Sequence, residues 1–130
     1  MKNHFNEINW EIAERSEEFF EALSLTVNEV IFYAIREIIR NSAKYAQNED
    51  EKIKLNIKTQ IGDDLQMIVE DNGQGINHET KSTGSGQGLK LHSTMIAVIG
   101  GYISVESEKN NFTRVTISLP ITESFKNSSQ

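Results

Sequence analysis

Apolar residues recur at helical spacing along one stripe of the segment Thr26 to Gln47, and this segment constrains the fold more than any other. Thr26 and Glu29 match a capping box, which predicts the start of the helix at this point. The stripe consists of Val27, Val30, Ile31, Ala34, Ile35 and Ile38. A helix with one buried stripe needs an apolar surface to pack against, and the rest of the chain must supply that surface.

Most of the remaining periodic segments alternate in the way that is typical of strands. They are Asn6–Ala13, Lys52–Ile61, Leu65–Val69, Tyr102–Glu106 and Phe112–Leu119. Further helical spacing is found only in Leu89–Ile99 and in the short stretch Ser16–Ser24. Because so few helices cannot cover both faces of a sheet, we expect an α+β fold. It would be a two-layer sandwich of one mixed sheet covered on one face by helices.

Length and composition indicate one globular domain. The chain has 130 residues, of which 37% are apolar and 25% charged. We expect the domain to span residues 1–121, followed by a disordered tail at 122–130. The net charge of −6 argues against nucleic-acid binding, which needs clustered Lys and Arg. Cysteine is absent and no apolar run has the length of a membrane span, so we expect a cytoplasmic domain without direct membrane contact.

Asn41 interrupts the apolar stripe of the long helix. At about 100° per residue, it points within roughly 20° of the direction of Ala34. Glu37 and Lys44 lie on the flank of the same stripe. A carboxylate, an amide and an ammonium at this spacing could hold Mg²⁺ and phosphate oxygens. An Asn bonded to backbone, beside two ordinary surface charges, explains the pattern equally well.

Two glycine-rich motifs lie in a predicted loop from Asp71 to Gly88. The first, Asp71-Asn72-Gly73-Gln74-Gly75-Ile76, follows a strand directly; Asn-Gly favours a turn, but no strand follows closely enough for a hairpin. Asp71 would there be placed to accept a hydrogen bond from an exocyclic amine. The second, Gly84-Ser85-Gly86-Gln87-Gly88-Leu89, leads into a helix, where free N–H groups favour a phosphate. Alone it could equally be a flexible linker, and it matches neither the Rossmann nor the Walker A pattern.

Taken in order, the three pieces resemble the Bergerat ATP site shared by DNA gyrase, the heat-shock chaperones, histidine kinases and MutL. The segment 37–46 resembles the N box, 71–76 the G1 box and 84–89 the G2 box. The ending from Gly100-Gly101 to Leu119-Pro120 is similar to that of histidine-kinase catalytic domains in particular. The resemblance covers residues 27–120 and implies an ATP-binding catalytic domain that uses ATP and Mg²⁺.

The resemblance also implies roles for individual residues. Asp71 would bind the adenine amino group, and Thr113 would lie beside the adenine. Asn41 would ligate Mg²⁺, with Glu37 positioning the ion or its water, so that Glu37, Asn41 and Lys44 form the catalytic set. The remaining nucleotide contacts would come from Lys44, Tyr45, Gly73, Gly75, Ile76, Gly84, Ser85, Gly86, Gln87, Gly88 and Leu89.

The chain departs from the family pattern in four places. Only the residues 77–83 separate the two glycine motifs, which indicates a short ATP lid. Tyr45 stands where many members have His, and Gln87 where Leu is usual. No histidine has the context of a phosphoacceptor, so the acceptor would belong to a helical dimerisation domain of the parent kinase. A response regulator would be an indirect partner, the parent protein can be membrane-anchored, and the isolated domain would be monomeric.

Three other functions compete with a histidine kinase. A stand-alone anti-sigma-factor serine kinase shares the fold, but the Gly100-Gly101 strand pair and Leu119-Pro120 favour the histidine-kinase branch. A non-catalytic switch that only binds nucleotide is disfavoured by Glu37, which binding alone does not need. An α+β interaction domain with incidental glycines would leave the order of the motifs unexplained.

Overall fold

The computed structural model describes residues 7–45, 54–72, 85–108 and 112–121, with the side chains of residues 7, 43–45 and 85–89 left out. The helices are α1 (Ser16–Glu21), α2 (Leu25–Tyr45) and α4 (Ser85–Val98). The strands are β1 (Glu7–Glu11), β2 (Lys54–Ile61), β3 (Asp64–Asp71), β4 (Tyr102–Glu108) and β5 (Phe112–Pro120). The predicted tail at 122–130 lies outside the described residues.

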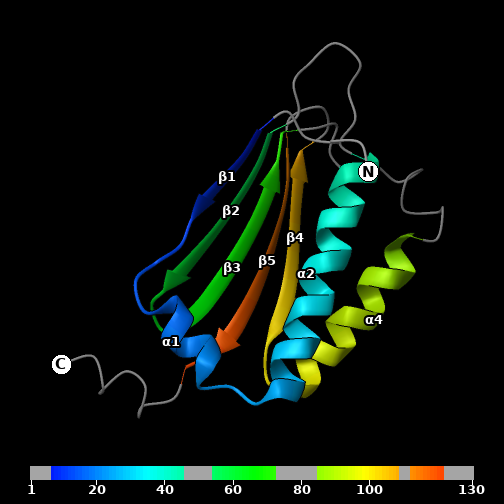
Figure 1. Ribbon diagram of the computed structural model, residues 1–130. Coiled ribbons are helices and arrows are strands. Elements are labelled where there is room, and N and C mark those ends of the chain that lie inside the picture. The colour runs from blue at the N-terminus through cyan, green and yellow to red at the C-terminus, as the bar shows by residue number, and fades with distance from the viewer. Residues whose placement is uncertain (1–6, 46–53, 73–84, 109–111, 122–130) are drawn as a thin grey trace.

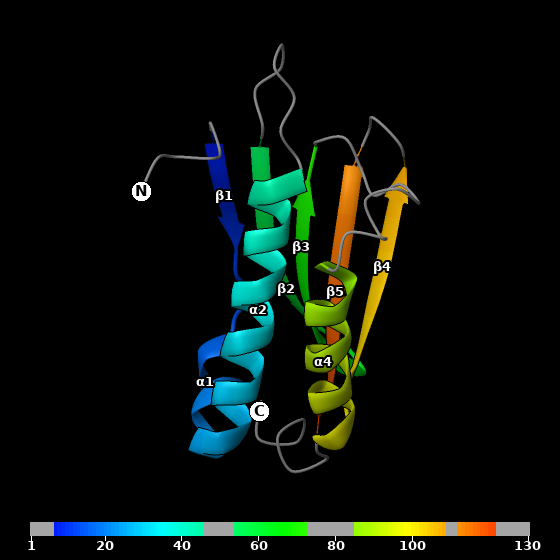
Figure 2. The same cartoon turned by 90° about the vertical axis from the view of Figure 1, so that its right-hand side faces the viewer.

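The strands form one five-stranded sheet in the order β1-β2-β3-β5-β4. β1 runs parallel to β2, and the other neighbouring pairs are antiparallel. Helices α2 and α4 cover one face of this sheet (Figures 1 and 2). The prediction of a mixed sheet with helices on one face is therefore confirmed. No helix in the described part of the chain combines the length and the apolar character needed to cross a membrane.

The core lies between the sheet and α2, as the apolar stripe predicts. Four stripe residues are buried, and Val27 and Ile35 pack against them half-buried. Strands β2, β3 and β5 supply the opposite wall, and burial alternates with a period of two most clearly along β2. The buried set is Phe19, Val30, Ile31, Ala34, Ile38, Leu55, Ile57, Leu65, Val69, Ile96, Val115, Ile117 and Leu119. Burial of each large side chain stabilises the fold by about 1.5–3 kcal/mol.

The start of α2 differs from the prediction. The helix begins at Leu25, so the N-cap is Ser24, whose Oγ accepts a hydrogen bond from the Val27 N–H at 3.1 Å. Thr26 lies inside the first turn, exposed, and the predicted capping box with Glu29 is wrong. Both Ser24 and Thr26 are good cap residues, and the helix uses the first of them, so its cap lies two residues earlier than predicted.

Two glycine-containing turns sit at the same end of the molecule. Gly62 and Asp63 close the β2–β3 hairpin as predicted, with the Gly62 N–H donating to the Asp64 carbonyl. After α4, Gly100 has a φ of 93° and donates to the Ala97 carbonyl, while Gly101 donates to the Ile96 carbonyl. A Cβ on Gly101 would lie 2.4 Å from the Ser118 carbonyl oxygen. Close approach of α4's end to β5 therefore requires glycine at position 101.

Candidate functional site

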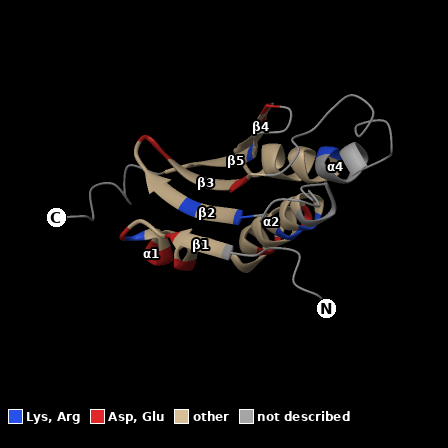
Figure 3. Cartoon of the chain, turned by 90° about the horizontal axis from the view of Figure 1, so that it is seen from above, with Lys and Arg blue, Asp and Glu red and all other residues tan. Residues whose placement is uncertain are grey.

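Four elements that carry the predicted site residues meet at one end of the fold (Figure 1). Helix α2 and strand β3 finish there and β5 begins there, whereas α4 points its first turn toward this end from lower down (Figures 1 and 2). Seen from this end, the helices form one layer and the sheet the other (Figure 3). The segment 73–84 joins β3 to α4 and contains Gly73, Gly75, Ile76 and Gly84, which lie outside the described residues.

Asp71 is the last residue of β3 and is only 2% exposed. Its register partners are Leu55 on β2 and Thr113 on β5, both buried. Directly paired residues project from the same face, so the carboxylate and the Thr113 hydroxyl group lie side by side on the helix-covered face. A buried carboxylate requires hydrogen-bond donors. This arrangement supports the predicted pairing of Asp71 and Thr113 at one subsite.

Asn72 holds the end of β3 in place, a role that the sequence did not predict. Its Oδ1 accepts a hydrogen bond from the Lys54 N–H at 2.7 Å, and its own N–H donates to the Lys54 carbonyl at 3.3 Å. These two bonds extend the β2–β3 ladder one residue past Asp71. In the sequence Asn72 was explained by the turn preference of Asn-Gly, and no local signal indicates a partner 18 residues away.

Glu37 and Asn41 lie one turn apart on α2, and both are half-buried. Asn41 therefore sits at the margin of the stripe, and Ser42 beside it is the buried polar residue, 7% exposed. Partly exposed carboxylate and amide oxygens remain accessible to a cation. Lys44 and Tyr45 belong to the last turn of α2, but their side chains lie outside the described part of the structure.

The described residues contain no group of three or more His, Asp or Glu side chains that could hold a metal ion. Mg²⁺ commonly takes only one or two protein ligands and completes its shell with water and substrate phosphate oxygens. Glu37 and Asn41 fit that donor set, because they are two oxygen donors on one helix face.

From Ser85 onward the second glycine motif is helical and not part of a loop. Helix α4 begins at Ser85, so Ser85, Gly86, Gln87 and Gly88 form its first turn, and Leu89 follows in the same helix. The predicted loop from Asp71 to Gly88 is thus too long at both ends, since Asp71 belongs to β3. The N–H groups of a first helical turn have no intrahelical partner. They can therefore bind an anion at the N-terminus of the helix, although the motif itself is helical.

An ion-pair network braces the strands on the other side of the sheet. Arg114 Nε contacts Glu70 Oε1 at 2.6 Å, and its NH1 group lies 3.6 Å from Glu106 Oε2. The hydrogen bond that Arg114 donates to Glu70 raises the pKa of the Arg114 guanidinium above its ordinary value. Because Arg114 and Glu70 directly neighbour Thr113 and Asp71 along their strands, the network fixes the strands that carry the site.

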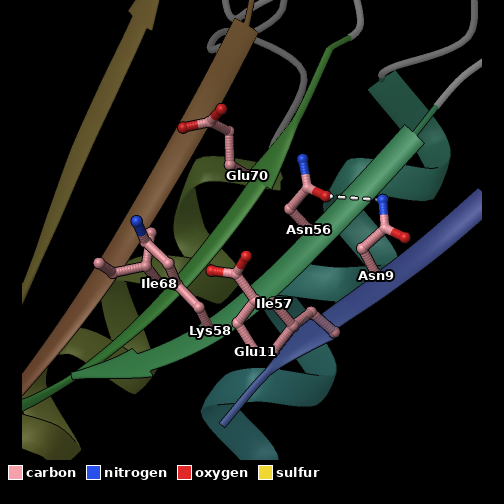
Figure 4. A pocket seen from close by; sticks show the side chains of 7 residues that line it. All are labelled: Asn9, Glu11, Asn56, Ile57, Lys58, Ile68 and Glu70. Carbon is pink, nitrogen blue, oxygen red and sulfur yellow. Dashed lines mark hydrogen bonds between the residues drawn. The ribbon is translucent and has the colours of Figure 1, made fainter. Parts of the chain in front are cut away.

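The face of the sheet that no helix covers, here called the open face, also carries a hollow that is separate from the candidate nucleotide site (Figure 4). It is lined by Asn9, Glu11, Asn56, Ile57, Lys58, Ile68 and Glu70. None of the predicted site residues lines it. Asp71 and Thr113 project from the helix-covered face of the sheet, whereas Asn56 and Glu70 point into the hollow on the opposite face.

Comparison with protein families assigns the fold to a known group. Residues 26–123 match the family of histidine kinase-, DNA gyrase B- and HSP90-like ATPases. The chain belongs to this family. The matched range contains all three boxes, and the resemblance inferred from them is confirmed at the level of the family.

Related proteins are histidine kinases. The chain is 35% identical over 103 residues to sporulation kinase D of Bacillus subtilis, covering 69% of this chain and 20% of that protein. It is 26% identical over 97 residues to the oxygen sensor histidine kinase NreB of Staphylococcus carnosus, covering 75% and 27%. The chain thus spans about a fifth to a quarter of the length of these relatives.

Solved structures show the same fold. The histidine kinase domain of the Erythrobacter litoralis blue-light activated kinase EL346 superposes with a TM-score of 0.69 at 16% identity, covering 92% of this chain and 57% of that one. The Acinetobacter baumannii histidine kinase AdeS superposes with a TM-score of 0.63 at 17% identity, covering 89% and 54%. At these identities the likeness concerns the fold alone.

Proposed function

We propose that this chain is the ATP-binding catalytic domain of a two-component sensor histidine kinase. It transfers the ATP γ-phosphoryl group to a histidine on a separate helical dimerisation domain. The observation that carries the proposal is the buried carboxylate of Asp71, held beside Thr113 at the end of the fold where α2 finishes and α4 begins. Family membership and the histidine kinases among the relatives support it.

In this proposal the nucleotide lies between the end of β3 and the start of α4. Asp71 accepts a hydrogen bond from the adenine amino group, and Thr113 lies beside the ring. The N–H groups at the start of α4 face the phosphates, where the positive end of the helix dipole favours anions. Lys44 adds a positive charge, and the glycines of both motifs let the backbone approach the ligand.

Asn41 and Glu37 are the residues that would hold Mg²⁺. When bound, the ion neutralises charge on the phosphate oxygens. Phosphoryl transfer requires mainly positioning and charge neutralisation, and this set of backbone groups, one amide and one carboxylate supplies both. The phosphoacceptor histidine is presented by the separate dimerisation domain of the parent kinase.

The cellular setting follows from the same proposal. The domain works in the cytoplasm, where ATP is available, whether or not the parent protein is anchored in a membrane. Its direct partner is the histidine-bearing dimerisation domain of the parent kinase. A response regulator receives the phosphoryl group afterwards and is an indirect partner.

A Glu37→Gln variant tests the catalytic part of the proposal. We expect ATP affinity to be retained and phosphotransfer to fall by about 10- to 100-fold, because the variant disturbs a group that positions the ion. The measurement is transfer of labelled phosphate from Mg²⁺-ATP to a histidine-bearing helical domain encoded in the same operon. Glu29→Gln is the matched control, since Glu29 lies two turns earlier on α2 and is exposed.

The chemistry of the product separates the competing functions. Acid-labile phosphohistidine supports the proposal, whereas acid-stable phosphoserine on a small antagonist protein would instead indicate the anti-sigma serine kinase. If Glu37→Gln alters neither binding nor signalling and no phosphoprotein forms, the chain is a nucleotide-binding switch.

A further inference from the structure

Strand β1 presents three large apolar side chains to solvent. Ile8, Trp10 and, just after the strand, Ile12 are 48%, 64% and 56% exposed. The side chains of Asn9 and Glu11, which alternate with them, point to the open face of the sheet (Figure 4). The apolar residues therefore project from the helix-covered face, where an apolar side chain is normally buried.

The exposure arises because the sheet extends one strand beyond its helical cover. Ile8 and Trp10 pair in register with Leu55 and Ile57 of β2, which are 1% and 4% exposed beneath α2. In Figure 2, β1 lies to the side of α2 and is not covered by it. The apolar layer of the core thus continues onto β1 without a second layer above it.

β1 is nevertheless firmly attached to the sheet. The Asn9 Nδ2 group donates to Asn56 Oδ1 at 3.0 Å. Just after the strand, the Ala13 N–H donates to Thr59 Oγ1 at 2.9 Å, and Thr59 shares a buried hydrogen bond of 2.7 Å with Ser16. The exposed apolar row is therefore held on a fixed strand.

The position of β1 also decides what kind of partner fits. Among the described strands, β1 is an edge, with a neighbour on one side only. Edge strands normally carry charges that disfavour pairing, and both edges of this sheet carry theirs on the open face, Glu106 and Glu108 on β4 and Glu11 on β1. On β1 the helix-covered face has no charge. A helix could cover these side chains, but only another strand could also continue the backbone ladder.

We propose that β1 pairs antiparallel with β1 of a second copy of this chain, about a two-fold axis at Trp10. This register places Trp10 opposite Trp10 and Ile8 opposite Ile12 on the apolar face. On the other face it places Asn9 opposite Glu11, so no like charges are paired. A register centred on Asn9 would instead set Glu7 against Glu11, which is destabilising.

The pairing closes on itself, because a two-fold axis uses the same patch on both copies. The five residues of β1 bury little area, so the dimer is weak and depends on concentration. This inference revises the monomer expected from the sequence. It is independent of the nucleotide site, which lies at the ends of β3 and α2.

The lone tryptophan makes the pairing directly measurable, since Trp10 is the only one in the chain. As concentration rises, sedimentation should show a shift from monomer to dimer mass, with a parallel blue shift of the Trp emission. Trp10→Glu should remain monomeric at every concentration at which the unchanged protein is dimeric. Tyr102→Glu is the matched control on the other edge strand, where Tyr102 is 54% exposed, and should dimerise normally. Circular dichroism checks that both variants fold.

Cysteine cross-linking tests the register, because the chain has no cysteine of its own. An oxidised mixture of Ile8→Cys and Ile12→Cys proteins should give a disulfide-linked dimer, since opposite residues have Cβ atoms about 4.5–5.5 Å apart. Ile8→Cys alone should not. A monomer over the whole range overturns the proposal. So does a dimer that survives Trp10→Glu, or a monomeric chain that uses Trp10 to bind the histidine-bearing helical domain.

Discussion

An Asp71→Asn variant should bind ATP at least about 50-fold more weakly than the unchanged chain. The carboxylate is 2% exposed, and the replacing amide would turn either its oxygen or its NH₂ group toward the adenine amine. A hydrogen bond to a charged group contributes about 1.5–3 kcal/mol, and a buried donor left without a partner costs about 1–3 kcal/mol more. Each 1.4 kcal/mol corresponds to about tenfold in affinity. Titration calorimetry with Mg²⁺-ATP measures the change.

Asp63→Asn is the control for this variant. Asp63 lies exposed in the β2–β3 turn at the opposite end of the hairpin, so its replacement should leave the affinity unchanged. Thermal unfolding without nucleotide shows whether Asp71→Asn still folds. Equal affinities for Asp71→Asn and the unchanged protein would disprove the adenine contact.

Gly101→Ala should destabilise the fold strongly. The added Cβ would lie 2.4 Å from the backbone oxygen of Ser118 and 3.1 Å from both Ile96 Cγ2 and Leu119 Cδ2. Since one of these contacts is to backbone, α4 or β5 would have to move. Overpacking of this kind costs about 1–3 kcal/mol, which corresponds to a fall in Tm of roughly 4–12 °C.

Gly62→Ala provides the comparison for Gly101→Ala. A Cβ on Gly62 would meet nothing within 4 Å, so the Tm should change little. Differential scanning calorimetry of the two variants under identical conditions measures the difference. If both variants have the same Tm as the unchanged chain, the close approach of Gly101 to Ser118 does not constrain the fold.

The sequence predicted those features of the fold that depend on local periodicity. The stripe of α2 and the period-two strands repeat within a few residues, so their burial could be inferred without knowing the partners. Asp71 at the end of β3 could be placed because a strand followed by Asn-Gly, without a second strand close behind, is a local pattern. The predicted start of α2 was wrong because Ser24 and Thr26 are both acceptable N-caps. The choice between them depends on the tertiary position of the helix.

Features that depend on contacts between distant residues could not be predicted. The Asn72–Lys54 bonds and the Glu70–Arg114–Glu106 network join positions whose proximity exists only after the strands pair. Ile8, Trp10 and Ile12 are exposed because β1 lies beside α2 and not beneath it, which their alternation in the sequence could not reveal. The roles of all the candidate site residues stay predictions, and Lys44, Tyr45 and the glycines of residues 73–84 also lie outside the part of the structure that is described with side chains.

The most direct test of the nucleotide site is to follow backbone amide resonances by NMR while Mg²⁺-ATP is added. The site assigned here predicts that the largest shifts fall on Asn41, Asp71, Thr113 and the first turn of α4. The amides of Gly62 and Gly100, at the opposite end, should hardly move. Shifts confined to the open face around Asn56 and Lys58, or no shifts at saturating nucleotide, would contradict it.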